Sequence, residues 1–154
     1  MNTISFRKAT KSDLPSIIEM LADDALGSTR EDFRIPLPEA YQIAFENIIG
    51  DNNQELIVVE TEDSKIIGTL QLTFIQYLTY RGGIRSQIEA VRIKKEFRGK
   101  GIGKQMFQFA IERAKERGAH LLQLTTDKRR PEAIQFYEDL GFTASHEGMK
   151  IHFK

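Results

Sequence analysis

Hydrophobic positions recur along this chain with two different periods, and each period predicts one kind of element. Spacing of three and four residues predicts helices over 14–21, 39–49 and 102–117. The third is the most strongly patterned, since one face of it collects six apolar residues: Ile102, Met106, Phe107, Ala110, Ile111 and Ala114. Pro131 suits the first turn of a fourth, shorter helix that ends at Leu140.

Apolar and β-branched runs between turn residues predict the strands. In chain order they cover 3–7, 56–60, 66–77, 85–93 and 120–125, and 142–153 adds one or two closing strands. Tight turns join the second, third and fourth strands, which indicates an antiparallel meander. The fourth and fifth enclose a helix, so they are expected to be parallel. The pattern therefore predicts an α+β fold with α/β/α layers, in which about four helices cover a mixed, mostly antiparallel central sheet of six to seven strands.

Composition fits one globular domain over residues 1–154. There are no cysteines, which excludes disulfides, thiolate metal sites and an acyl-cysteine intermediate, and fits a cytoplasmic location. No stretch has the apolar character of a signal peptide or a membrane span. The 22 basic residues balance 22 acidic ones, so bulk charge does not indicate nucleic acid. His120, His146 and His152 lack the spacing of metal ligands, and no metal is expected.

The most informative stretch runs from Arg98 to Lys104, where three glycines alternate with Lys100 and Ile102. Glycines at this spacing allow positive φ and let a ligand approach the backbone. The helix that follows places free N–H groups and a positive dipole end at this loop, which is the arrangement that binds phosphate. We therefore interpret residues 98–104 as a diphosphate-binding loop.

Other glycine loops fit this stretch less well. A P-loop requires glycine at position 98 and Ser or Thr at 105, where the chain has Arg98 and Gln105. A dinucleotide fingerprint starting at Gly99 requires glycine in place of Lys104, although Asp127 after the next strand agrees with it. A flexible basic loop without a ligand is the remaining alternative.

A second basic group, Lys128 to Arg130, follows the fifth predicted strand. Because that strand and the one before the diphosphate loop are expected to be parallel, both basic groups should lie at one sheet edge, where such sheets bind ligands. The acidic residues between the first two helices are diluted by Arg30 and Arg34 and are expected to be solvated: Asp23, Asp24, Glu31 and Asp32.

Four segments in this order resemble the GNAT acetyltransferase superfamily: Gln87–Ile93, Arg98–Lys104, Ala133–Tyr137 and Leu140–Phe142. The family's Q/R-x-x-G-x-G/A motif matches at Arg98, Gly101 and Gly103. The first half of the chain agrees with the family only in the order of its elements. The resemblance implies a GNAT-like fold with acetyl-CoA as co-substrate, in which residues 84–154 bind acetyl-CoA and residues 1–83 form the acceptor side.

The resemblance assigns the diphosphate to the loop amides and the pantetheine arm to the backbone of the preceding strand. The expected cofactor contacts are Ala90, Val91, Arg92, Ile93, Arg98, Gly99, Lys100, Gly101, Ile102, Gly103, Lys104, Asp127, Arg130, Ala133 and Phe136. Many members have an Asn seven positions before a conserved tyrosine, and this chain has Arg130 there. The pantetheine contact of that Asn is then lost, taken over by Asp127, or exchanged for a phosphate contact.

Two side chains are candidates for the chemistry of acetyl transfer. Glu89 on the expected cofactor strand can accept the proton of the amine, and pairing with Arg85 or Arg92 is its structural alternative. Tyr137 matches the family's tyrosine that protonates the departing thiolate, and it also lies on an apolar helical face suited to packing. The backbone N–H near Val91 can polarise the thioester carbonyl.

The sequence thus predicts a cytoplasmic N-acetyltransferase that moves an acetyl group from acetyl-CoA to the primary amine of a small molecule or peptide, by direct attack in a ternary complex. No nucleic acid or membrane partner is expected, and the resemblance implies a homodimer. Two alternatives stay open: a non-catalytic acyl-CoA-binding module on the same fold, and a dinucleotide-binding oxidoreductase.

Overall fold

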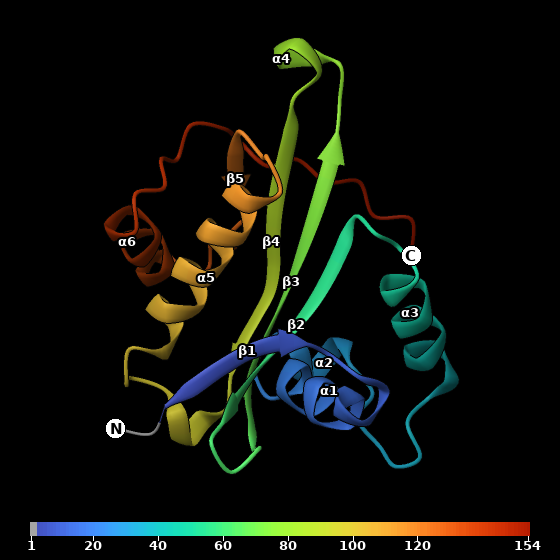
Figure 1. The fold of residues 1–154 in the computed structure, drawn as a ribbon. Coiled ribbons are helices and arrows are strands. Elements are labelled where there is room, and N and C mark those ends of the chain that lie inside the picture. The colour runs from blue at the N-terminus through green and yellow to red at the C-terminus, as the bar shows by residue number, and fades with distance from the viewer. Residues whose placement is uncertain (1–2) are drawn as a thin grey trace.

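A five-stranded sheet in the order β1-β2-β3-β4-β5 forms the centre of the computed structural model, which describes residues 3–154 (Figure 1). The strands are β1 (Ile4–Lys8), β2 (Gln54–Thr61), β3 (Ile66–Gln76), β4 (Ile84–Ile93) and β5 (Leu121–Gln123). Strands β1 to β4 pair antiparallel, and β4 pairs with β5 in parallel. The predicted meander and the predicted parallel pair are therefore confirmed.

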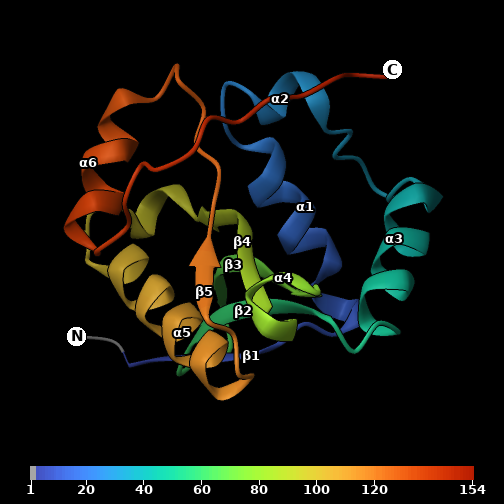
Figure 2. The same cartoon turned by 90° about the horizontal axis from the view of Figure 1, so that it is seen from above.

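Four of the helices are the predicted ones, with ends that differ from the prediction by one residue at most: α1 (Leu14–Ala22), α3 (Glu39–Ile49), α5 (Ile102–Glu116) and α6 (Pro131–Asp139). Two further single turns, α2 (Gly27–Arg30) and α4 (Thr79–Gly82), lie in segments without a helical pattern. Helices α1, α2 and α3 lie on one side of the sheet, and α5 and α6 lie on the other (Figure 2).

The alternation of side chains along β2 explains why both faces of the sheet are covered. Ile57 and Val59 are buried in the core that includes Met106 of α5, whereas Val58 is buried against α1 and α3. Since successive strand residues point to opposite faces, a run of apolar residues in one strand supplies two cores. This layering holds α5 firmly against the strands that it connects.

The predicted closing strands in 142–153 are wrong. Residues 142–154 contain no strand, so the sheet has five strands rather than six to seven. Met149, Ile151 and Phe153 alternate as in a strand, but they are 93%, 82% and 92% exposed. A strand needs a neighbour to pair its N–H and C=O groups, and this segment has none within residues 3–154. The segment runs from α6 toward the side of the molecule where α3 lies (Figure 1).

Glu55 connects β2 to α5 through a buried ionic contact. Its side chain is 1% exposed, and its Oε1 lies 2.6 Å from Arg113 Nη2 and 3.0 Å from Arg117 Nη1. Burial acts to raise the pKa of Glu55, but the hydrogen bonds and charge of Arg113, with the charges of Lys8 and Arg117, hold that pKa below its ordinary value. The carboxylate therefore stays ionised and fixes α5 against the sheet.

None of the helices within residues 3–154 is long and apolar enough to cross a membrane.

We expect Glu55→Gln to lower the free energy of unfolding by about 3 kcal/mol, because it removes the charge that two guanidiniums share in a buried site. Urea denaturation at neutral pH measures the change. Glu112→Gln is the matched control, since Glu112 pairs with Lys115 on the exposed face of α5 and should leave stability unchanged. Equal losses in the two variants would contradict the structural role of Glu55.

Candidate active site

The diphosphate loop (Arg98–Lys104) leads directly from the end of β4 into α5. Gly99 and Gly101 have φ angles of 73° and 78°, in the left-handed region that other residues adopt only with strain. Gly101 is the N-cap of α5, and no side chain caps this helix. The N–H groups of its first turn are therefore free for a ligand, and the helix dipole favours an anion there. The loop has the geometry that a phosphate group requires.

Arg98 holds this loop against the strand that precedes it. Its Nε donates a hydrogen bond to the carbonyl oxygen of Ile93 at 3.0 Å, and its Nη2 lies 3.9 Å from Asp23 Oδ2. Lys100 lies with its Nζ 5.2 Å from the centre of the Phe97 ring. Lys104 is exposed. The side chains of Lys100 and Lys104 are thus available to a ligand at the surface of the loop. The side chain of Arg98 is already used to hold the loop in place.

Three of the elements that carry the predicted site meet at Gly103. A Cβ atom on Gly103 would lie 3.5 Å from Cδ1 of Ile93 at the end of β4 and 3.7 Å from Cζ of Phe136 on α6. The start of α5 is therefore in van der Waals reach of both neighbours. The structure brings together the loop, the strand end and the short helix that sequence reasoning assigned to one site.

A β-bulge distorts β4 next to this point. Thr69 and Gln71 of β3 are paired with Arg92 and Glu89 of β4, so Leu70 faces both Ala90 and Val91. Ala90 has a φ of 54°, which is rare for a residue with a side chain. Bulges of this kind bend a strand and redirect its backbone groups. No residue-type signal predicts this bulge, because alanine has no preference for positive φ.

After Gln87, β4 has an open edge that includes the bulge. Strand β5 pairs with β4 only through Arg85–Gln87 and Leu121–Gln123. From Ile88 to Ile93 no strand among the described residues pairs with β4 on the β5 side. The two strands part here, as Figure 1 shows. Backbone N–H and C=O groups along this edge can pair with an extended ligand as an added strand would.

Tyr137 lies on α6 in an aromatic cluster beside the parted strands. Its ring centre is 5.5 Å from that of Phe107, 5.6 Å from that of Phe136 and 6.1 Å from that of Phe142. Burial raises the pKa of the Tyr137 hydroxyl above its ordinary value, although the charges of Arg130 and Arg92 oppose the shift. The ring thus has the packing role that the helical pattern indicated, and the hydroxyl remains protonated and able to donate a proton.

Glu89 is exposed on β4 next to the bulge. Its carboxylate accepts a hydrogen bond from Gln87 Nε2 at 3.4 Å. The alternative of a structural pair with Arg85 or Arg92 is not found, because Arg92 lies against Asp24 and Arg85 stacks over the Tyr77 ring. The carboxylate is therefore accessible to a ligand.

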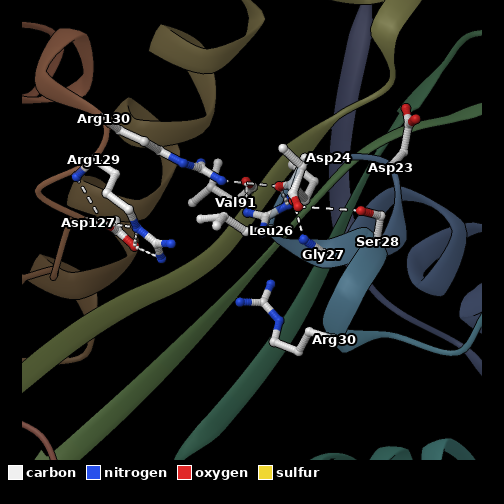
Figure 3. Close-up of polar contacts among 12 residues, drawn as sticks. Asp23, Asp24, Leu26, Gly27, Ser28, Arg30, Val91, Asp127, Arg129 and Arg130 are labelled. Atoms are coloured by element: carbon white, nitrogen blue, oxygen red, sulfur yellow. Dashed lines mark hydrogen bonds and ion pairs between the residues drawn. The ribbon is translucent and has the colours of Figure 1, made fainter.

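The expectation that Asp24 and Glu31 are solvated is wrong, since each of these side chains is only 18% exposed. Asp24 Oδ2 lies 3.2 Å from Arg92 Nε and 3.3 Å from Arg130 Nη2, and its other oxygen accepts the N–H of Gly27 (Figure 3). Burial acts to raise the pKa of Asp24, but the Gly27 N–H and the two arginines hold it below its ordinary value. These contacts of Asp24 hold the loop after α1 against β4. No local sequence signal reveals them.

Asp127 and Arg130 were both expected to contact the cofactor, but in the structure they contact different residues. Asp127 accepts hydrogen bonds from the N–H, Nε and Nη2 of Arg129, and these bonds hold its pKa well below the ordinary range. It shapes the turn before α6. Arg130 instead reaches across to Asp24, and Ala133 is half-buried on α6.

Residues 3–154 contain no group of three or more metal-ligating side chains placed to hold a metal ion.

Comparison with known proteins agrees with this geometry. A profile of the acetyltransferase (GNAT) family matches residues 22–142. An L-methionine sulfoximine/L-methionine sulfone acetyltransferase from Pseudomonas paraeruginosa is 28% identical over 92% of this chain and 81% of its own length. An aminoalkylphosphonate N-acetyltransferase from Salmonella typhimurium is 24% identical over 95% and 89% of the two chains. The solved structure of a transcriptional regulator from Bacillus halodurans C-125 is 55% identical, with a TM-score of 0.94 over 98% of this chain and 100% of that one.

We expect Gly101→Ala to lower the free energy of unfolding by about 1 kcal/mol, because φ there is 78° while nothing lies within 4 Å of the added methyl group. Thermal or urea unfolding measures the loss. Gly148→Ala is the matched control: its methyl group is equally free of contacts, but its φ is not in the left-handed region. A destabilisation of the same size in both variants would refute the account of the loop backbone.

Proposed function

This chain belongs to the GNAT acetyltransferase family and is an acyltransferase, and from this premise we propose that it transfers an acetyl group from acetyl-CoA to the primary amine of a small molecule. One observation carries the assignment of the site: the uncapped start of α5 lies directly beside the unpaired edge of β4, at Gly103. A ligand with a diphosphate and an extended amide-containing arm fits these two features together.

The residues that would hold acetyl-CoA follow from this arrangement. We assign the diphosphate to the N–H groups of Gly99–Lys104 and the pantetheine arm to the open edge at Ala90–Ile93. Acetyl-CoA supplies the acetyl group in the form of an activated thioester. Within one domain over 1–154, we place acetyl-CoA against residues 84–154, and residues 1–83 form most of the acceptor side.

The proposed acceptor is a small molecule rather than a peptide. Two relatives are named for small amine substrates, L-methionine sulfoximine or sulfone in one case and aminoalkylphosphonate in the other. These names support an acceptor of similar size for this chain. The absence of nucleic acid and membrane partners and the cytoplasmic location stay predictions from the composition.

The proposed reaction is a direct transfer. The chain has no cysteine to carry an acetyl group, so the amine nitrogen forms its bond to the acetyl carbon as the bond from that carbon to sulfur breaks. We assign to Glu89 the removal of the amine proton and to Tyr137 the donation of a proton to the departing thiolate. The N–H of Val91, at the bulge, is the proposed donor to the carbonyl oxygen.

We expect Tyr137→Phe to lower kcat for acetyl transfer about 100-fold, with little change in KM for acetyl-CoA, because the variant keeps the ring packing and loses the proton donor. Release of free CoA in the presence of a panel of small amines measures the rate. Because the pKa of Tyr137 is raised, its proton stays in place through neutral and mildly alkaline pH, and the wild-type rate should not fall there through loss of this proton.

Tyr77→Phe is the control for Tyr137→Phe. It makes the same chemical change in a tyrosine that contacts His120 at the far end of β3, and it should leave kcat unchanged. A Tyr137→Phe enzyme with wild-type kcat would remove Tyr137 from the mechanism.

We also retain the homodimer as a prediction. The outer edge of β5 pairs with no strand among residues 3–154, and Met149, Ile151 and Phe153 are exposed. Both features support association with a second copy of the chain. Sedimentation should give twice the chain mass of 17.7 kDa, and Ile151→Glu should shift the protein toward monomer. A wild-type protein that sediments as a monomer would contradict the prediction.

A further inference from the structure

Three arginines from distant parts of the sequence gather beside β4, where burial and the charges of Arg130 and Arg30 together lower the pKa of Arg92. Arg30 belongs to α2, Arg92 lies near the end of β4, and Arg130 is the N-cap of α6. We refer to these three residues as the arginine cluster. Figure 3 shows Arg130 reaching across to Asp24 from the side of α6 and Arg30 approaching from α2.

The cluster has more hydrogen-bond donors than its surroundings use. A guanidinium offers five N–H donors. Arg92 donates one hydrogen bond, from Nη1 to the carbonyl oxygen of Val91 at 2.9 Å. Its buried Nε lies 3.2 Å from Asp24 Oδ2 but forms no hydrogen bond. Arg130 donates through Nη2 to Asp24 at 3.3 Å. Both guanidiniums contact the same oxygen of Asp24, which leaves their remaining donors for another acceptor.

The cluster also carries more positive charge than its neighbours compensate. Asp24 faces both Arg92 and Arg130, and Glu31 pairs with Arg30 at 3.0 Å while it also accepts a hydrogen bond from the Tyr41 hydroxyl. Two carboxylates thus face three guanidiniums. The side chains of Arg92 and Asp24 are only 17% and 18% exposed, so solvent screens the charge of Arg92 weakly. Those of Arg130 and Arg30 are 39% and 55% exposed, so an anion can reach them from solvent.

The position of the cluster separates it from the diphosphate loop. Arg130 stands at the start of α6, whereas Phe136, the α6 residue next to Gly103, lies more than one helical turn further along. The charges of Arg130 and Arg92 reach the Tyr137 hydroxyl, where they act against the effect of burial on its pKa. An anion at the cluster would therefore lie beside the proposed reacting centre and away from the diphosphate.

We propose that Arg30, Arg92 and Arg130 bind an anionic group of the acceptor, so that the substrate is a small primary amine that also carries a carboxylate, phosphate or phosphonate. The inference rests on the acetyl transfer proposed above and names its substrate class. Planar guanidiniums suit such groups because two N–H donors can bind two oxygens of one oxyanion. On binding, the anionic group takes the place of Asp24 at Arg92 and Arg130.

Asp24 then acts as a competitor for the acceptor's anionic group. Its carboxylate neutralises the arginines while no acceptor is bound and must give way when one enters. Asp24→Asn keeps the size of the side chain and an oxygen for the Gly27 N–H, but it removes the competing charge. This variant should bind an anionic amine more tightly, whereas a role of Asp24 in holding the acceptor's ammonium group would make binding weaker.

Calorimetry on the CoA-loaded protein tests the proposal with three matched amines: ethylamine, β-alanine and 2-aminoethylphosphonate. We expect at least one of the two anionic amines to bind more tightly than ethylamine, by about tenfold or more. Arg130→Gln and Arg30→Gln should each weaken its binding about tenfold. Arg34→Gln is the control, since it removes the same charge from an exposed arginine that pairs with Asp32.

The outcomes decide between carboxylate and oxyphosphorus acceptors and can also overturn the proposal. Preference for β-alanine or for 2-aminoethylphosphonate identifies the anionic group. The proposal is wrong if ethylamine binds as tightly as both anionic amines, or if neither anionic amine binds. It is also wrong if Arg34→Gln and Arg130→Gln have equal effects, or if Asp24→Asn binds the anionic amine more weakly. Because the experiment measures binding without turnover, a failure of acetyl transfer shows itself separately, as a protein that does not bind acetyl-CoA or does not release CoA.

Discussion

The candidate site depends on the point at which β5 stops following β4. Pairing ends at Gln87 and Gln123, and β4 continues through the bulge at Ala90 without a partner on that side. If β5 continued to pair with β4, it would occupy the backbone N–H and C=O groups that an extended ligand needs. The rings of Phe107 and Tyr137 pack in one core cluster with Val91 of β4 and Leu124 beyond β5, so side-chain packing supports the separation.

The parted strands also bring charges together that are distant in the sequence. Arg130 and Asp24 are separated by 106 positions, and they meet because the loop before α6 and the loop after α1 face each other across the end of β4. In this half-buried setting each charge acts more strongly on its neighbours than it would in water. The same geometry that exposes the edge of β4 thus places an arginine cluster and a protonated tyrosine beside it.

Local signals in the sequence were sufficient for the elements that build the diphosphate loop. The apolar face of α5 and the glycines at 99 and 101 are short-range patterns, and the structure agrees with both. Patterns that depend on a distant partner were less reliable. Alternation in 149–153 predicted a strand, but a strand requires a neighbour to pair with, and the burial of Asp24 depends on Arg92 and Arg130. The positive φ of Ala90 had no residue-type signal at all.

Binding of acetyl-CoA by the loop is the central claim, and calorimetry of the wild-type protein against Gly101→Glu tests it most directly, with NADH as the competing ligand. A carboxylate at position 101 would obstruct the first turn of α5 and repel the diphosphate, so we predict tight binding of acetyl-CoA by the wild type and at least tenfold weaker binding by the variant. Gly148→Glu adds the same charge outside the loop and should bind as the wild type does. A folded wild-type protein that does not bind acetyl-CoA, or that binds NADH instead, would contradict the account.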